Sequence, residues 1–120
     1  MTFNTEVVLK GRDFAVTHTC SVPHGDPGSW DAGAVRDVLA EILRAIERAG
    51  NPDADPARPV ILQGFSWIVQ PADEGVVIAI EIPMGAAVAG PFPIGEQVLD
   101  GLISRAMRAE PRPGGAATVH

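Results

Sequence analysis

The segment at residues 24–31 carries the side chains best suited to chemistry in this sequence. The imidazole of His24 can exchange a proton near neutral pH, and a carboxylate beside it can act as a general acid or base. Asp26 and Asp31 lie in the same segment, and Glu81 interrupts a distant apolar run, where it faces the open side of the predicted sheet. Asp31 also suits the N-cap of a following helix, and we favour that role for it. The site hypothesis therefore places His24 at the centre, with Asp26 or Glu81 as its carboxylate.

A second segment, residues 84–93, is almost wholly apolar. A polar loop and an apolar loop at comparable ends of a sheet can frame a ligand pocket, either within one chain or at a subunit interface. The predicted ligand-binding residues are His24, Asp26, Trp30, Glu81 and Phe92. In this hypothesis Trp30 or Phe92 forms the apolar wall. The alternative is that the polar loop is a solvated turn and that a partner buries the apolar loop, and the lack of a recognisable motif favours this alternative.

His18 and Cys20 alternate along one predicted strand, so they share a face at a separation of about 7 Å. That separation suits a shared metal ion or a thiol–imidazole pair, with His24 as a third ligand. The spacing matches no known zinc motif, and buried cysteine and histidine are more often part of a core. We therefore expect no metal and no cofactor, and a core role or a functional role for the pair stays open.

The composition excludes several classes of partner and of protein. Nine basic residues against fifteen acidic ones give a net charge of −6, so no basic patch is available for nucleic acid or for an anionic membrane. A single cysteine argues against a disulfide-rich secreted scaffold. The sequence lacks a phosphate loop, a nucleophile elbow, an HExxH motif and a CxxC pair, so no reaction class can be named. With no signal peptide and no apolar span of sufficient length, the cytoplasm is the expected location.

The elements that position these residues follow an approximate repeat. Sliding the chain by sixty residues superposes residues 22–25 on 82–85, and apolar positions of the two following helices coincide. The repeat units span about 5–49 and 65–109. The expected fold is an α+β two-layer sandwich, an internally duplicated ββα-ββα with a four-stranded, mostly antiparallel sheet and two helices on one face. The alternative is that two hairpin–helix units resemble each other by chance.

Hydrophobic periodicity sets the expected boundaries of these elements. The predicted strands lie at 6–10, 14–22, 60–70 and 76–82. Apolar residues at three- and four-residue spacing predict helices over 32–49 and from about residue 93 onward. A single domain, residues 1–109, precedes a Pro-, Gly- and Ala-rich tail at 110–120, which we expect to be disordered.

The sheet face away from the helices is the second surface of interest. It would carry Thr17, Thr19, Leu62, Ile68, Val77 and Ala79. This set is too apolar for contact with water, so a homo-oligomer, dimer or higher, is the simplest expectation. The outline is similar to that of several small bacterial oligomers, although an outline alone assigns no function. The leading interpretation is a non-catalytic accessory or chaperone-like protein-binding module, and the alternative is a small-molecule-binding protein or an enzyme.

Overall fold

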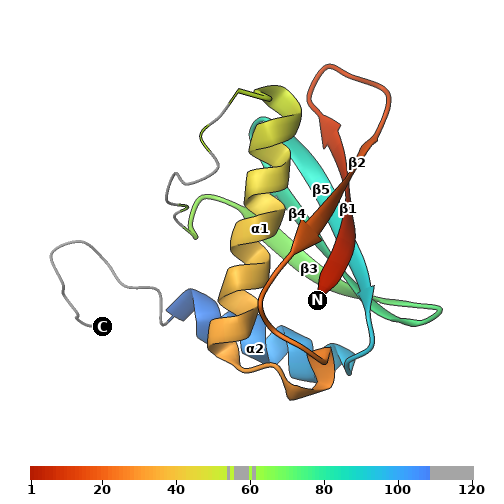
Figure 1. Cartoon of the computed structure of the whole chain (residues 1–120), viewed down its shortest axis with the longest axis vertical. Helices are drawn as coiled ribbons and strands as arrows, with labels where there is room; N and C mark the ends of the chain where they lie inside the picture. The colour runs from red at the N-terminus through yellow and green to blue at the C-terminus, as the bar shows by residue number, and fades with distance from the viewer. Residues whose placement is uncertain (54, 56–59, 61, 109–120) are drawn as a thin grey trace, which may run out of the picture.

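Five strands and two helices are arranged in two layers, with both helices on one side of the sheet (Figure 1). The computed structural model describes residues 1–53, 55, 60 and 62–108. The strands are β1 (Thr2–Leu9), β2 (Val16–Ser21), β3 (Ser66–Ala72), β4 (Gly75–Ile82) and β5 (Gly85–Phe92). The helices are α1 (Ala32–Gly50) and α2 (Glu96–Arg108), and a short 3-10 helix at Pro27–Ser29 precedes α1. The α+β class predicted from the sequence is confirmed.

The sheet has the strand order β2-β1-β5-β4-β3, and every neighbouring pair is antiparallel. The predicted number of four strands is wrong, because most of the segment at 84–93 forms the central strand β5 instead of a loop. Along β5 the buried Ala87 and Ala89 alternate with the exposed Val88. Alanine and glycine are depleted in strands, so this run does not resemble one in sequence. Pairing with β1 on one side and β4 on the other outweighs that low propensity.

Gly85 shows why small residues occupy the start of this strand. A Cβ atom at this position would lie only 2.6 Å from the carbonyl oxygen of Val8 on β1. Close by, the backbone N–H of Lys10 donates to the carbonyl of Met84 at 2.9 Å. The missing side chain therefore allows β1 to pack closely against the turn between β4 and β5.

The predicted internal duplication is not reproduced as two equal units. The first unit, residues 5–49, has two strands before its helix, whereas the second has three (Figure 1). The second strand of the first unit, β2, lies at an edge of the sheet, whereas its counterpart β4 is flanked by β3 and β5. The similarity at the sixty-residue offset therefore reflects a shared hairpin-and-helix pattern and not a shared topology.

The core lies between the helices and the inner face of the sheet. The predicted apolar stripe of α1 is confirmed for its fully buried members Val35, Val38, Leu39, Ile42 and Ile46. Burial of each such side chain contributes about 1.5–3 kcal/mol to folding. The predicted N-cap is also confirmed, because Asp31 Oδ1 accepts a hydrogen bond from the backbone N–H of Ala34 at 2.8 Å.

Several predicted boundaries differ from the structure. The third strand begins at Ser66 and not at residue 60, so Leu62 is a buried core residue and does not lie on the open sheet face. The second helix begins at Glu96, three residues after the proline expected to start it. The tail at 110–120 lies outside the described residues. Neither of the two helices in the described part of the chain is long and apolar enough to cross a membrane.

Candidate functional site

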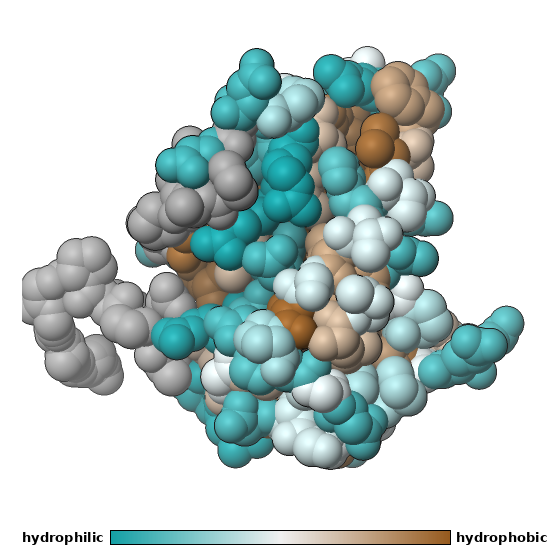
Figure 2. All heavy atoms as spheres, viewed as in Figure 1, coloured by the Kyte–Doolittle hydropathy of each residue, from teal (hydrophilic) through white to brown (hydrophobic). Residues whose placement is uncertain are grey.

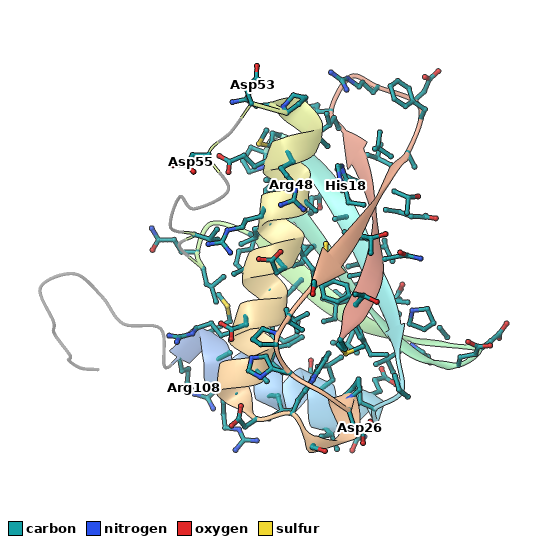
Figure 3. All side chains as sticks on the ribbon, in the orientation of Figure 1. His18, Asp26, Arg48, Asp53, Asp55 and Arg108 are labelled. Atoms are coloured by element: carbon teal, nitrogen blue, oxygen red, sulfur yellow. The ribbon has the colours of Figure 1, made fainter. Side chains whose placement is uncertain are left out.

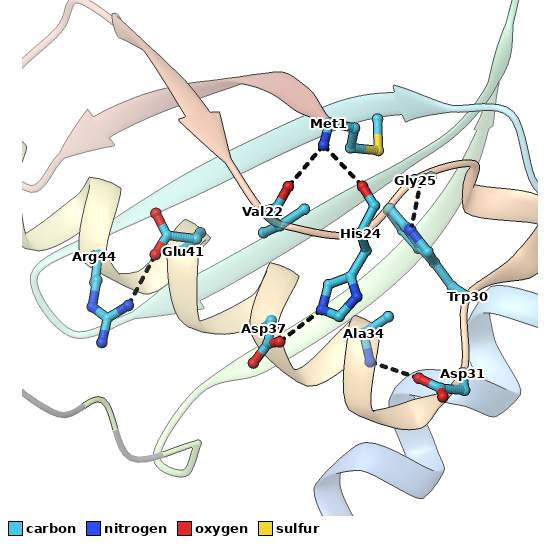
Figure 4. A network of polar contacts seen from close by, with 10 residues as sticks. All are labelled: Met1, Val22, His24, Gly25, Trp30, Asp31, Ala34, Asp37, Glu41 and Arg44. Atoms are coloured by element: carbon cyan, nitrogen blue, oxygen red, sulfur yellow. Dashed lines mark hydrogen bonds and ion pairs between the residues drawn. The ribbon is translucent and has the colours of Figure 1, made fainter.

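His24 follows β2 and is held against the second turn of α1. Its ring nitrogen Nε2 lies 2.7 Å from Oδ2 of Asp37, and both side chains are partly exposed (Figure 4). The backbone carbonyl of His24 also accepts a hydrogen bond from the amino group of Met1 at 2.8 Å. A partly exposed ion pair of this kind contributes about 0–1 kcal/mol to stability. The contacts of His24 therefore fix the path of the chain between β2 and α1.

The other polar residues of the 24–31 loop complete local structure. Asp26 is exposed and caps the short 3-10 helix by accepting a hydrogen bond from the backbone N–H of Gly28 at 3.3 Å. The indole N–H of Trp30 donates to the carbonyl of Gly25 at 3.1 Å (Figure 4). Each of these groups therefore has a partner within the loop itself.

Trp30 and Phe92 are in contact with each other and form part of the core. Trp30 is 8% exposed and Phe92 is fully buried. The Phe92 ring makes edge-to-face contacts with Trp30 and with Phe3, at centroid separations of 5.2 Å in both cases. The two aromatic side chains fill the space between the 24–31 loop and β5, where the sequence hypothesis places a pocket.

Glu81 lies on the outer face of the sheet, away from the helices. It is exposed on β4, between Ser66 of β3 and Ala86 of β5 in the strand register. His24 contacts α1 on the opposite side of the sheet. The structure therefore brings Trp30 and Phe92 together but separates Glu81 from the histidine that it was expected to assist.

A groove of about 520 Å³ lies beside the His24–Asp37 pair, between the end of β2 and α1. Its wall includes four charged residues of α1, namely Arg36, Asp37, Glu41 and Arg44. Within this set, Nη1 of Arg44 donates to Oε2 of Glu41 at 2.9 Å. These residues were not among the predicted site residues, although their three- and four-residue spacing places them on one face of a helix.

Cys20 is buried in the core beneath α1. Its sulfur lies 3.4 Å from the hydroxyl of Thr5 and donates to the carbonyl of Glu41 at 3.9 Å. Burial raises the pKa of the Cys20 thiol above its ordinary value, although the Thr5 hydrogen bond and the charge of Arg48 oppose the shift. A thiol with a raised pKa stays protonated at neutral pH and is a poor nucleophile.

His18 lies two residues before Cys20 on β2, and Figure 3 shows it opposite the half of α1 that carries Arg48. Its Nε2 atom is buried and has no hydrogen-bond partner among the described residues. Within that part of the chain, no group of three or more His, Cys, Asp or Glu side chains is arranged to hold a metal ion.

The outer face of the sheet is covered by neither α1 nor α2. Hydrophilic side chains gather over α1 on the helix side (Figure 2), whereas the outer face carries exposed Val8, Ile68 and Val88. These side chains are 41%, 52% and 44% exposed, respectively. In the register of the sheet, Val88 is adjacent to Ala79, which is adjacent to Ile68. We call this surface the open face and define it by the outward-facing residues Glu6, Val8, Ile68, Val77, Ala79, Glu81, Ala86 and Val88.

The open face is acidic as well as apolar. The five strands contain no lysine and no arginine, and Glu6 and Glu81 are their only acidic residues. Glu6 is adjacent to Val88 across β1 and β5, and Glu81 is adjacent to Ala86 across β4 and β5. Both side chains are exposed. The two carboxylates therefore flank the central strand of the open face from opposite sides.

Comparisons with known proteins give no relative from which a site could be transferred. No protein-family model, no curated protein and no solved structure matches this chain significantly.

Proposed function

We propose that this protein is a non-catalytic protein-binding module and that the open face is its contact surface. The observation that supports this proposal is the exposure of Val8, Ile68 and Val88 on one face that neither α1 nor α2 covers. A contiguous apolar surface is costly in water and is typical of protein interaction sites. Val77 and Ala79, which the sequence analysis assigned to this surface, extend it across β4.

The arrangement of the candidate acid–base groups among the predicted ligand-binding residues favours binding over catalysis. His24 is engaged by Asp37, and Asp26 caps a helical turn. Glu81 lies on the other side of the sheet. General acid–base catalysis needs the reacting groups within hydrogen-bond reach of one bound substrate, directly or through one water. The three groups do not meet that requirement in this arrangement.

A small-molecule site is the second candidate, and one observation favours it. The groove of about 520 Å³ beside Asp37 is within the size range of ligand pockets and has charges of both signs on its wall. A cationic ligand there would compete with His24 for Asp37. The groove is therefore a candidate ligand site. Its location differs from that of the pocket expected between the 24–31 and 84–93 loops.

Site-specific photo-crosslinking in the native cells tests the proposal. A photo-reactive phenylalanine analogue is placed at position 88 on the open face and, as a matched control, at position 98 on α2, where the native valine is 57% exposed. We expect a discrete protein adduct from position 88 and none from position 98.

The mass of the adduct identifies the occupant of the open face. An adduct of twice 12.6 kDa would assign the face to self-association, the homo-oligomer expected from the sequence, and any other mass would assign it to a different protein. The proposal is wrong if position 88 gives no adduct, or if both positions give the same mixture.

A further inference from the structure

We propose that the partner of the open face is a protein segment that combines apolar side chains with lysine or arginine, and that it is not a second copy of this chain. This inference rests on the proposed function, because it specifies the chemistry of the partner at the same surface. The observations that carry it are the positions of Glu6 and Glu81 within the apolar face and the absence of any basic residue from the strands.

The two carboxylates have no partner within the described part of the chain. Glu6 lies between Thr17 of β2 and Val88 of β5 in the register. Glu81 lies between Ser66 and Ala86. No hydrogen bond or ion pair joins either carboxylate to another described residue. A partner that covers the apolar side chains beside them must also remove water from these charges.

Burial of an unpaired carboxylate is strongly unfavourable. A partner therefore binds the open face well only when it supplies a cation near each of the two carboxylates. Charge complementarity of this kind also selects against partners with the wrong sign.

A second copy of the chain cannot supply those cations from its own open face, because its strands contain no lysine or arginine. Stacking two open faces would bring four carboxylates together, because each copy contributes Glu6 and Glu81 and no lysine or arginine from its strands. The nearest basic residue in sequence is Lys10, beyond the end of β1. The net charge of −6 on each chain adds to the repulsion. Electrostatics thus oppose self-association through this face.

The strand geometry predicts the spacing of the partner's cations. Glu6 and Glu81 are two strands apart and are offset by two residues along the strands. With about 4.8 Å between strands and about 3.4 Å per residue, the two backbone positions are about 12 Å apart. Residues i and i+4 of an extended strand share one face at a separation of about 13 Å. A segment with the pattern Lys-x-Val-x-Lys thus places a cation at each carboxylate and an apolar residue between them.

The probes are three fluorescent peptides that differ in one property each. The first contains the unit Lys-Thr-Val-Thr-Lys once, the second has Glu in place of each Lys, and the third has Ser in place of the Val. We expect the first peptide to bind the wild-type protein at least tenfold more tightly than either of the others, as measured by fluorescence anisotropy.

Two double variants with the same net charge show whether peptide binding depends on the two carboxylates of the open face. We expect Glu6→Gln with Glu81→Gln to weaken binding of the first peptide by at least about tenfold, because each lysine then loses the carboxylate that it pairs with at the interface. Glu96→Gln with Asp100→Asn removes the same two charges from exposed positions on α2. This control should leave the affinity unchanged within about twofold.

Three results would overturn the inference. They are equal binding of the Lys and Glu peptides, equal binding of the Val and Ser peptides, and an equal loss of affinity in both double variants. An adduct of twice the chain's mass from position 88 would also contradict it while leaving the proposed function intact. Failure of the proposed function is a separate result, namely no adduct from position 88.

Discussion

The side chains of the 24–31 loop act mainly on the chain around them. Asp31 caps α1, Asp26 caps the 3-10 helix, and Trp30 joins the core while its indole N–H is satisfied by a backbone carbonyl. Serine, aspartate and asparagine before a helix commonly have this capping role. Aspartate, a residue type suited to catalysis, therefore caps helices in this loop. The capping role of Asp31 can be predicted from the sequence alone.

Replacement of His24 by methionine should have only a small effect on folding. The pair with Asp37 is partly exposed, so solvent screens it and we expect the free energy of unfolding to fall by less than about 1 kcal/mol. Chemical denaturation measures this value, and Asp37→Ala serves as the matched control because it removes the same pair. A loss of more than about 2 kcal/mol in His24→Met alone would show that the imidazole has a further structural role.

We expect the protein to lose stability at alkaline pH because of the buried thiol of Cys20. Burial raises the pKa of its thiol in the folded chain, whereas the thiol of the unfolded chain ionises at about pH 8.5. The stabilising contribution of the protonated Cys20 thiol is therefore complete below about pH 8.5. It is lost as the pH rises through the pKa of this thiol in the folded chain. In that interval the slope approaches about 1.4 kcal/mol per pH unit.

Denaturation of the wild type and of Cys20→Ala between pH 8 and pH 10 checks this expectation. All other titrating groups are shared, so the wild type should lose stability more steeply than the variant. Equal slopes would mean that the thiol ionises alike in the folded and unfolded chains.

At the scale of elements, α1 and β5 show what sequence patterns can and cannot reveal. The apolar spacing of α1 and its Asp31 cap are local signals, and they predict the start of the helix at residue 32 and its end to within one residue. The stability of β5 depends on distant pairing, for example between Val7 and Ala87. Gly85 is required by close packing against β1, and that requirement is invisible before the partner strand is known.

Two glycine substitutions test the packing of β5. Gly85→Ala should destabilise the protein by more than about 2 kcal/mol, because its Cβ would collide with backbone atoms of β1 that cannot move freely. Gly101→Ala lies on α2 with open space around its Cβ and should stabilise the helix by about 0.5–1 kcal/mol. We expect thermal unfolding to show a lower melting temperature for Gly85→Ala and a higher one for Gly101→Ala, each relative to the wild type. Stabilisation by Gly85→Ala would show that β1 and β5 are not packed in this way.

At the scale of the whole molecule, the two layers differ in charge. Lysine and arginine are confined to segments outside the strands, and the sheet presents Glu6 and Glu81 among apolar residues. Strand alternation correctly predicts that Glu81, Ile68 and Val77 face away from the helices. Glu81 and His24 lie on opposite sides of the sheet because of the way the two layers pack. Local sequence patterns carry no information on this packing, so they could not test the predicted site.

The most direct test of the central claim is to map where the Lys-Thr-Val-Thr-Lys peptide binds, using amide NMR spectra of the labelled protein. We expect the largest shift changes along the open face, at Glu6, Val8, Ile68, Ala79 and Val88. Amides around His24 and Asp37, beside the groove on α1, should change little. Changes concentrated at that groove would contradict the assignment of the open face as the binding surface.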